Sequence, residues 1–275
     1  MAEAKIPSTL ALIAGGCAGT VVDVSLHPLD TLRTRIQSAE GFWKAGGFRG
    51  TYKGIMSAAM GSAPGAALFF CSYETMKGVF KNHAGDEHWT HHAFASSFGE
   101  VAACLVRVPT AVVTQNMQVG RYASFTEAVT STHSAGGLRA FYVGYGTTVM
   151  REIPFSFIQF PIYEGLKKIY GAFKGRETNP AEGATAGSIA GSIASALTTP
   201  LDVAKTRIML EKPVEGQAKK YNGTVQTLST IAREEGFLAL YKGIVPRVSW
   251  ITIGGFIFFG AYESAQAVLW KTGVW

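Results

Sequence analysis

The chain has 275 residues, of which 16% are charged, 32 are glycine and three are cysteine, and its formal net charge is +6. Typical soluble proteins carry about 25% charged residues, whereas here the charges lie between apolar stretches close to the ~20 residues that span a bilayer. This pattern indicates an all-α membrane protein. A soluble protein with unusually buried helices is the alternative that composition leaves open.

Several kinds of site are disfavoured. Cys17, Cys71 and Cys104 lie inside apolar stretches without CxxC spacing, which argues against a disulfide framework or a metal site. The sequence has no nucleophile–base pattern or phosphate-binding loop, so we expect neither an enzyme nor a cofactor. Its basic residues form no aromatic-rich patch, which disfavours a nucleic-acid partner. Residues 1–9 lack the character of a transit peptide. The positive charge suits an anionic lipid surface or an anionic ligand.

The first predicted span, residues 8–37, contains a segment that recurs twice. PLDTLRTR at residues 28–35 returns as PLDVAKTR at 200–207, whereas PTAVVTQN at 109–116 keeps the proline and none of the charges. A proline removes one backbone hydrogen bond, so we expect a kink in each odd-numbered span. Membrane helices tolerate such kinks when neighbouring groups satisfy the freed carbonyl.

Two further markers follow each copy in the same order. With the proline segment as the first marker, the second marker is a tyrosine two residues before a glycine, at Tyr52–Gly54, Tyr142–Gly144 and Tyr241–Gly243. The third marker is a Tyr-Glu pair 19 residues beyond each glycine, at 73–74, 163–164 and 262–263. Three markers repeated three times indicate a triplicated structure. We place the repeats at residues 8–87, 88–177 and 178–275 of one domain that covers residues 1–275.

Each repeat is predicted as helix, polar connection, helix. The even-numbered spans cover roughly residues 55–78, 145–169 and 244–271. Glycines one turn apart in the odd spans let a neighbouring backbone approach closely: Gly15 with Gly19, and Gly187 with Gly191. Residues 225–235 best fit a short amphipathic helix along the membrane surface. Six spans bring both termini to one side.

These markers resemble the mitochondrial carrier family over the whole chain. The family pattern is proline, any residue, acid, two residues, base, any residue, base, and later acid-Gly and aromatic-base-Gly. The third copy matches fully, with Glu235-Gly236 and Tyr241-Lys242-Gly243, and the first lacks only the acid, which Gly46 replaces. The resemblance implies six tilted helices around a pseudo-three-fold axis in the mitochondrial inner membrane, short matrix-side helices, a monomer, and alternating access to one central site.

The resemblance also implies a charge network at each end. The matrix-side network would use Asp30, Arg33, Asp202 and Lys205. Since Ala111 and Thr114 cannot form ion pairs, Asp202–Arg33 is the only cyclic pair left, and we expect a weak gate braced by Gln115. An ion pair within one helix is the alternative for Asp30 and Arg33. The cytoplasmic network would use Tyr73, Glu74, Lys77, Tyr163, Glu164, Lys167, Tyr262 and Glu263. Cardiolipin sites are implied at Lys53, Gly54, Gly144, Lys242 and Gly243.

By the same resemblance, substrate contacts lie seven and eight residues after the glycine of each aromatic-base-Gly marker. This gives Gly61 with Ser62, Arg151 with Glu152, and Trp250 with Ile251. Charges at membrane depth are costly and are functional candidates. Arg151 can hold a carboxylate and Glu152 an ammonium group, and Trp250 offers a flat aromatic face. The alternatives are an Arg–Glu pair that stabilises the bundle and a tryptophan used in packing.

Asp23 adds a lone acid five residues before Pro28, where the other repeats have Cys104 and Ser195. It has no basic residue nearby in sequence, so we expect it to face a cavity. Glu100 and Arg107, two turns apart, could pair with each other or contact the substrate.

The segment around Asp23 and the segment REIPFS at residues 151–156 resemble those of family members that carry S-adenosylmethionine. This implies exchange of cytosolic S-adenosylmethionine for matrix S-adenosylhomocysteine, with Asp23 facing the sulfonium or ammonium group and Trp250 stacking on adenine. Residue chemistry alone supports only a cationic solute with an amino-acid group. A carrier of basic or neutral amino acids, or a leak or structural membrane protein with impaired exchange, are the alternatives.

Overall fold

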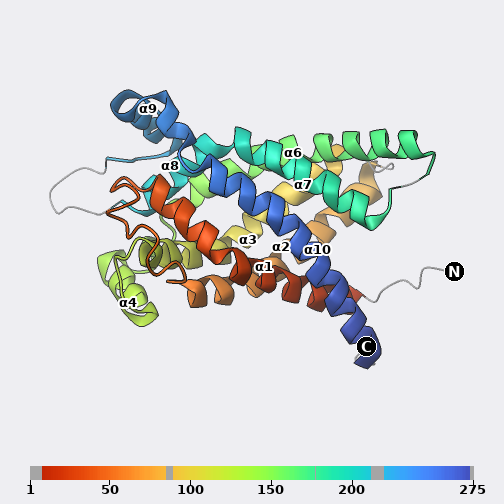
Figure 1. Cartoon of the computed structure of the whole chain (residues 1–275), viewed down its shortest axis with the longest axis horizontal. Helices are drawn as coiled ribbons and strands as arrows, with labels where there is room; N and C mark the ends of the chain where they lie inside the picture. The colour runs from red at the N-terminus through yellow and green to blue at the C-terminus, as the bar shows by residue number, and fades with distance from the viewer. Residues whose placement is uncertain (1–7, 85–88, 177, 212–219, 273–275) are drawn as a thin grey trace.

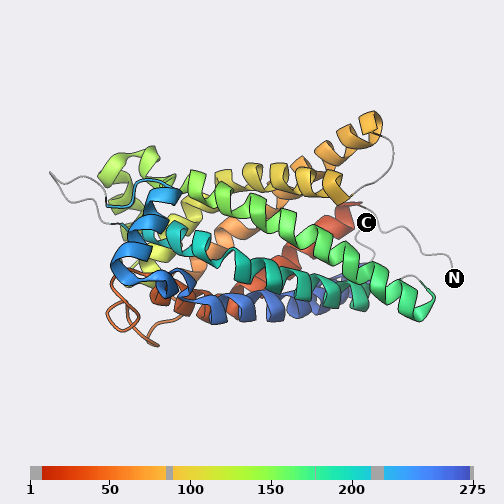
Figure 2. The same ribbon diagram turned by 90° about the horizontal axis from the view of Figure 1, so that it is seen from above.

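The computed structural model describes residues 8–84, 89–176, 178–211 and 220–272 (Figure 1). The helices of its six spans are α1 (Ser8–Gln37), α2 (Ile55–Ala84), α3 (Trp89–Gln118), α6 (Tyr145–Lys174), α7 (Pro180–Leu197) with α8 (Thr199–Met209), and α10 (Ile244–Thr272). Each span contacts the next, and α10 contacts α1, so the bundle closes into a ring. Figure 2 shows the spans running along the length of the molecule. This confirms the predicted all-α arrangement of six spans.

The short helices gather at one end of the bundle, which we call the surface-helix end (Figure 1). They are α4 (Phe125–Gly136), α5 (Leu138–Phe141), α9 (Thr224–Glu235) and the 3-10 helix η1 (Phe237–Tyr241). The helix predicted over residues 225–235 is confirmed by α9, and α4 begins with a capping box between Ser124 and Glu127. In the first repeat, residues 38–54 form turns. The start of α1 and the end of α10 lie at the opposite end, the terminal end.

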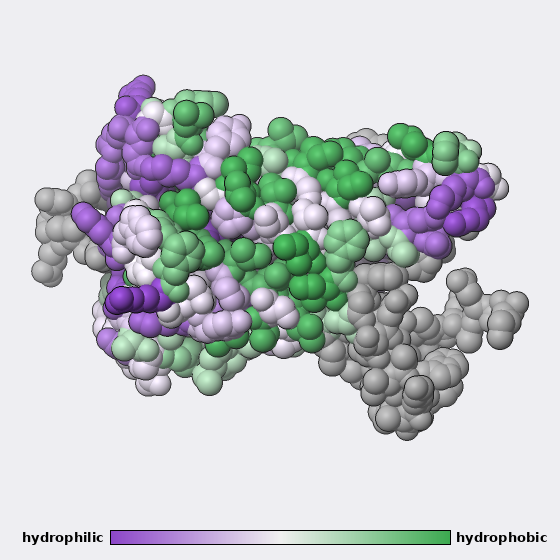
Figure 3. Space-filling model, viewed as in Figure 1, coloured by the Kyte–Doolittle hydropathy of each residue, from purple (hydrophilic) through white to green (hydrophobic). Residues whose placement is uncertain are grey.

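The outer surface is suited to a membrane. The face in Figure 3 is apolar along much of the middle of the bundle, and hydrophilic residues gather towards its ends. Large apolar side chains on the long helices are exposed, including Met56, Leu105, Val245 and Phe256. By length and hydropathy alone, two described segments could each cross a membrane, Ile55–Phe80 and Thr90–Gln118. The other spans carry more charged residues, and several of these point into the bundle.

The motif prolines have different effects in the three repeats. Helices α1 and α3 continue through Pro28 and Pro109, but the fifth span, predicted as one kinked helix, is divided at Thr198 into α7 and α8. Pro109 cannot donate to the carbonyl of Leu105, one turn earlier. The hydroxyl of Tyr142 donates to that carbonyl instead, at 3.1 Å. The tyrosine of the second marker therefore supports the proline of the first marker in the same repeat.

The glycines of the second marker join neighbouring repeats. Gly54, Gly144 and Gly243 begin the even spans with φ of +86°, +81° and +80°. A Cβ atom on each would lie 3.0–3.1 Å from the odd span of the next repeat, against Thr114, Met209 and Gln37 respectively. Left-handed backbone and close packing thus both require glycine at these positions.

We expect Gly54→Ala to lower the thermal stability of the purified protein. Left-handed backbone costs an alanine about 1–2 kcal/mol, and the carbonyl of Thr114, 3.0 Å from the added Cβ, adds about 1–3 kcal/mol of overpacking. Gly120→Ala is the matched control, because Gly120 has φ +74° and nothing within 4 Å of a built Cβ. Thermal unfolding in detergent micelles should show a larger loss for Gly54→Ala. Equal losses would contradict the packing argument.

Three arginines, which we call the clasps, tie the repeats together at the surface-helix end. The Nε of Arg35 donates to the carbonyl of Gln118 at 2.7 Å, and the Nε of Arg207 donates to that of Gln37 at 2.6 Å. Both are the second base of the repeated motif. The second repeat has Asn116 there, but Arg121 donates to the Asn116 side chain and reaches the carbonyl of Leu210 at 2.7 Å. Each clasp satisfies a carbonyl at the end of an odd span of the next repeat.

A carboxylate outside the spans supports one clasp. Glu235, at the end of α9, contacts Arg207 and Lys242, each at 2.7 Å. Burial raises the pKa of this carboxyl, but hydrogen bonds and charge from Arg207 and Lys242 outweigh burial, so its pKa is below the usual 4.5. A lowered folded-state pKa stabilises the fold above pH 4.5, and this contribution is lost as pH falls through the folded-state value.

Glu235→Gln should therefore reduce thermal stability at pH 7 and should flatten the loss of stability that the unaltered protein shows below about pH 4.5. The measurement is the unfolding temperature of both proteins from pH 7 to pH 3. An unchanged acid-side slope in the variant would show that Glu235 is not linked to folding in this way.

Candidate functional site

A cavity of about 590 Å³ lies in the centre of the bundle. It falls within the ~300–1,000 Å³ typical of small-molecule sites. Six of the seven residues predicted to contact substrate line it, from α1, α2, α6 and α10: Asp23, Ser62, Arg151, Glu152, Trp250 and Ile251. Residues far apart in the sequence thus meet in one chamber, as the register of the three repeats predicted.

The seventh predicted residue, Gly61, is not among the residues that line the cavity. It is buried, and a Cβ atom there would lie 2.4 Å from Oγ1 of Thr110. Its role is to let α2 and α3 pack closely, which corrects the predicted substrate contact. The next residue, Ser62, lines the cavity together with Asp23.

The surface-helix end of the cavity is closed by a cluster around Asp202, whose side chain is fully buried. Arg33 donates to Asp202 Oδ2 from Nε at 2.7 Å and to Oδ1 from Nη2. Gln37 donates to Oδ2 at 2.8 Å, while Arg247 and Arg151 have nitrogens 3.0 and 3.5 Å from Oδ1. We call these residues the Asp202 cluster. The pairing between repeats that the motif implied is therefore present, alongside a 3.6 Å contact between Arg33 and Asp30.

Three members of this cluster were not anticipated from the sequence. Arg247 is 1% exposed and also donates to the hydroxyl of Thr198 at 2.7 Å. It lies four residues beyond Gly243 in the sixth span, so its charge at membrane depth was an available signal. Gln37 lies two residues beyond Arg35. Arg151, from the second repeat, brings a cation to Asp202, which corrects the expectation of a gate held by one ion pair.

The glutamine that supports the matrix-side charge network is Gln118, not the predicted Gln115. Gln118 donates to Oδ2 of Asp30 at 2.9 Å, whereas Oε1 of Gln115 is buried without a hydrogen-bond partner among the described residues. Gln118, fully buried, lies one turn nearer the surface-helix end and therefore reaches Asp30. This corrects the prediction for Gln115, which lines the cavity instead.

Further charges line the cavity wall. Arg107 donates to Glu100 at 2.7 Å, so the two residues pair with each other, as one of the two interpretations predicted. Arg151 pairs with the adjacent Glu152. Lys205 also lines the cavity, and within the described residues its ammonium group makes no hydrogen bond or ion pair.

The residues predicted for the cytoplasmic network lie towards the terminal end. The Tyr73 hydroxyl lies 2.9 Å from Nδ1 of His92. Glu74 is exposed on α2, one helical turn before Lys77. Lys167 contacts residues of its own helix, with Nζ 3.7 Å from Glu164 and 5.2 Å from the centre of the Tyr163 ring. The side chains predicted at Tyr262 and Glu263 lie outside the described residues.

This end is hollow. A second space of about 1220 Å³ is lined by Tyr163, Glu164 and Lys167. It shares Ile251 and Phe258 with the central cavity. The chamber therefore continues towards the terminal end, while the Asp202 cluster closes the opposite side.

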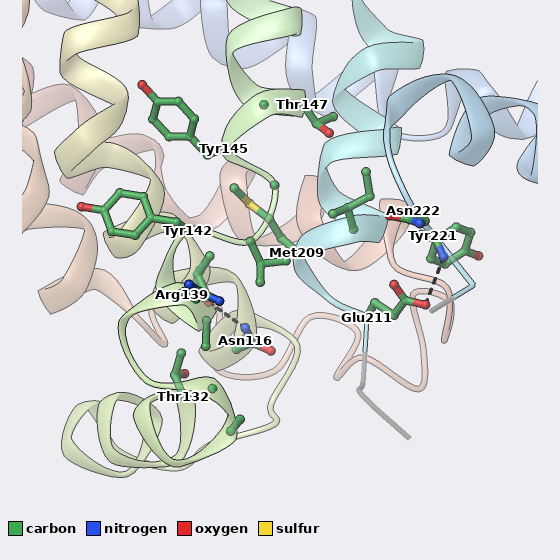
Figure 4. Close-up of a pocket in the computed structure, with 18 of the residues that line it drawn as sticks. Asn116, Thr132, Arg139, Tyr142, Tyr145, Thr147, Met209, Glu211, Tyr221 and Asn222 are labelled. Carbon is green, nitrogen blue, oxygen red and sulfur yellow. Dashed lines mark hydrogen bonds between the residues drawn. The ribbon is translucent and has the colours of Figure 1, made fainter. Parts of the chain in front are cut away.

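One of the helix starts predicted to bind lipid borders a third pocket, of about 680 Å³, at the boundary of the second and third repeats (Figure 4). Gly144 precedes the first turn of α6, and Gly223 precedes that of α9, so two helix N-termini meet there. Arg139 is exposed along the pocket and Arg121 lines it, although the second marker has Val143 instead of a base. At the other starts, Lys53 is exposed, and Lys242 pairs with Glu235.

Comparison with known proteins relates the whole chain to one family of membrane carriers. A family model described as "Mitochondrial carrier protein" matches residues 4–84, 85–174 and 176–273. The "Mitochondrial S-adenosylmethionine carrier protein" of Danio rerio is 46% identical over 262 residues, which cover 95% of this chain and 97% of the relative. The protein of the same name from Mus musculus is 45% identical, with 96% of each covered. The "S-adenosylmethionine mitochondrial carrier protein homolog" of Drosophila melanogaster is 46% identical, covering 95% and 93%.

Proposed function

This chain belongs to the mitochondrial carrier family, and from that membership we propose that it transports S-adenosylmethionine across the mitochondrial inner membrane in exchange for S-adenosylhomocysteine. It is a multi-pass transporter rather than an enzyme and acts as a monomer. The observation that carries the proposal is the meeting of Asp23, Glu152 and Trp250 in one central cavity, with relatives of about 45% identity named as carriers of this solute.

The charges of the cavity fit the two cationic groups of S-adenosylmethionine. Asp23 lies on α1 and Glu152 on α6, so one acid can face the sulfonium and the other the ammonium group. Trp250, on α10, offers a face on which adenine can stack. A carrier of a basic or neutral amino acid would use Arg151 and Glu152 but would need neither Asp23 nor Trp250.

The geometry also supports alternating access. The Asp202 cluster closes the end that bears α4 and α9, the matrix side in this family, while the cavity continues towards the terminal end. We assign this arrangement to the state open to the cytoplasm. Opening to the matrix requires Arg33, Arg151 and Arg247 to leave Asp202.

The loss of motif charges from the second repeat was the basis for the alternative of a leak or structural protein. The second repeat nevertheless contributes Arg151 to the Asp202 cluster and Arg121 as a clasp. These contacts favour a working exchanger.

The direct test is uptake of radiolabelled S-adenosylmethionine into liposomes that contain the full chain, with and without internal S-adenosylhomocysteine. We expect uptake that is stimulated by the internal substrate and inhibited by adenosine-containing analogues. Inhibition by free methionine or arginine but not by such analogues would favour an amino-acid carrier. Unstimulated leakage of unrelated solutes would favour the leak protein.

We further propose that the pocket in Figure 4 holds a phosphate group of cardiolipin. Two helix N-termini and Arg139 supply donors and positive charge for an anion there. Cardiolipin should raise the unfolding temperature of the purified protein more than phosphatidylcholine does. Equal effects of the two lipids would contradict this assignment.

A further inference from the structure

The closed end of the cavity carries more positive than negative charge. Four cations lie there, namely Arg33, Arg151, Arg247 and Lys205. The carboxylates in contact with them are Asp202, Glu152 and Asp30. Each arginine lies within 3.6 Å of a carboxylate oxygen, which leaves Lys205 as the cation without a partner among the residues described.

The sequence of the second repeat explains why Lys205 is unpaired. The acid of the third repeat, Asp202, meets the base of the first, Arg33. By the same cyclic order the base of the third repeat, Lys205, should meet an acid from the second, but Ala111 occupies that position. Ala111 and Lys205 both line the cavity, so the missing carboxylate leaves the ammonium group facing the chamber.

The other cations of the cavity are already engaged. Arg107 donates to Glu100 at 2.7 Å, and Arg151 contacts both Glu152 and Asp202. A carboxylate that arrived at either arginine would have to displace an existing partner. Lys205 has none to displace, and a half-buried ammonium group without a counter-ion is unfavourable at membrane depth.

We propose that Lys205 binds the carboxylate of the amino-acid group of the transported solute. Lys205 then determines specificity, and the carboxylate of the solute replaces the acid that the second repeat lacks. This inference rests on the proposed function for the identity of the solute. The carboxylate of the solute is thus assigned to Lys205 instead of Arg151, the residue expected from the sequence. Asp23 and Glu152 remain assigned to the sulfonium and ammonium groups of the solute.

The test compares S-adenosylmethionine with decarboxylated S-adenosylmethionine, which keeps the sulfonium, the amine and the adenine. Uptake of both is measured in liposomes with the full chain and with Lys205→Met. We expect the unaltered protein to prefer the carboxylate-bearing solute by roughly 10- to 100-fold, the range of a charged hydrogen bond. Lys205→Met should reduce that preference to about twofold or less. Lys205→Arg, which keeps the positive charge, should retain the preference for the carboxylate-bearing solute. Lys220 is exposed and outside the cavity, so Lys220→Met should leave this preference unchanged.

Ala111→Glu gives a second test, because it supplies an internal carboxylate to Lys205. It should lower uptake of S-adenosylmethionine by about tenfold while affecting the decarboxylated solute much less. If Lys205→Met abolishes all transport, the shift in unfolding temperature caused by each solute replaces uptake as the readout. A retained preference for the carboxylate in Lys205→Met, by either readout, overturns the inference. Failure of the unaltered protein to take up S-adenosylmethionine would overturn the proposed function and this inference together.

Discussion

Asp202→Asn is expected to lower the unfolding temperature of the purified protein by on the order of 10 °C and to stop transport. The Asp202 side chain is fully buried and contacts Arg33, Arg151 and Arg247. Removal of one partner from a buried ion pair costs about 3–5 kcal/mol, because the remaining charge stays buried. About 1 kcal/mol shifts the unfolding temperature of a protein of this size by roughly 2–4 °C.

Asp30→Asn is the matched control, since Asp30 occupies the equivalent position of the first repeat. Its side chain is 36% exposed, and its contacts are one amide donor at 2.9 Å and a 3.6 Å ion pair. Exposed pairs contribute about 0–1 kcal/mol, so its unfolding temperature should change by only a few degrees. The role assigned to the Asp202 cluster fails if the two substitutions have similar effects.

Asp23→Ser should reduce uptake of S-adenosylmethionine by about 100-fold or more. Truncating one partner of a buried charge pair costs about 2–5 kcal/mol, and Asp23 is the acid that we assign to a cationic group of the solute. Serine is the residue that the third repeat has at this position, Ser195, so the backbone and packing tolerate its size. Liposome uptake and substrate-induced thermal stabilisation measure the effect.

Cys104→Ser is the control for that substitution. Cys104 holds the equivalent position in the second repeat and is fully buried in α3, and the change alters one atom. Uptake should stay within a few-fold of the unaltered protein. If Asp23→Ser retains full uptake and full stabilisation by the solute, Asp23 does not bind the cationic group.

The six spans could be predicted from the sequence because each one carries its own marker. Pro28, Pro109 and Pro200 mark the odd spans, and a glycine with positive φ starts each even span. These are local signals, so the start of the first span and of each even span was placed at the residue found in the structure. The break at Thr198 was missed, because a proline inside a helix gives no indication of whether the chain bends or divides there.

The site was predicted less completely because its contacts depend on side-chain reach between repeats. Asp23 was placed at the cavity because a lone acid in an apolar stretch is visible in the sequence, and Glu152 because of its spacing from Gly144; both line the cavity. Arg247 was overlooked because it belongs to no repeated marker. Gln118 was missed in favour of Gln115, since the choice between two glutamines one turn apart depends on how α3 faces Asp30.

The clasps have a consequence for how this sequence can change. Their acceptors are main-chain carbonyls of Gln37, Gln118 and Leu210, and every residue type offers the same carbonyl. Substitutions at these receiving positions therefore leave the clasp bonds themselves intact, provided that the helix end stays in place, even where the side chains of Gln37 and Gln118 have further partners in Asp202 and Asp30. Arg121 illustrates the same tolerance for the donor, because it makes this attachment from a residue five positions beyond Asn116. A repeat can thus lack the recognisable motif and still be joined to its neighbour in the same way.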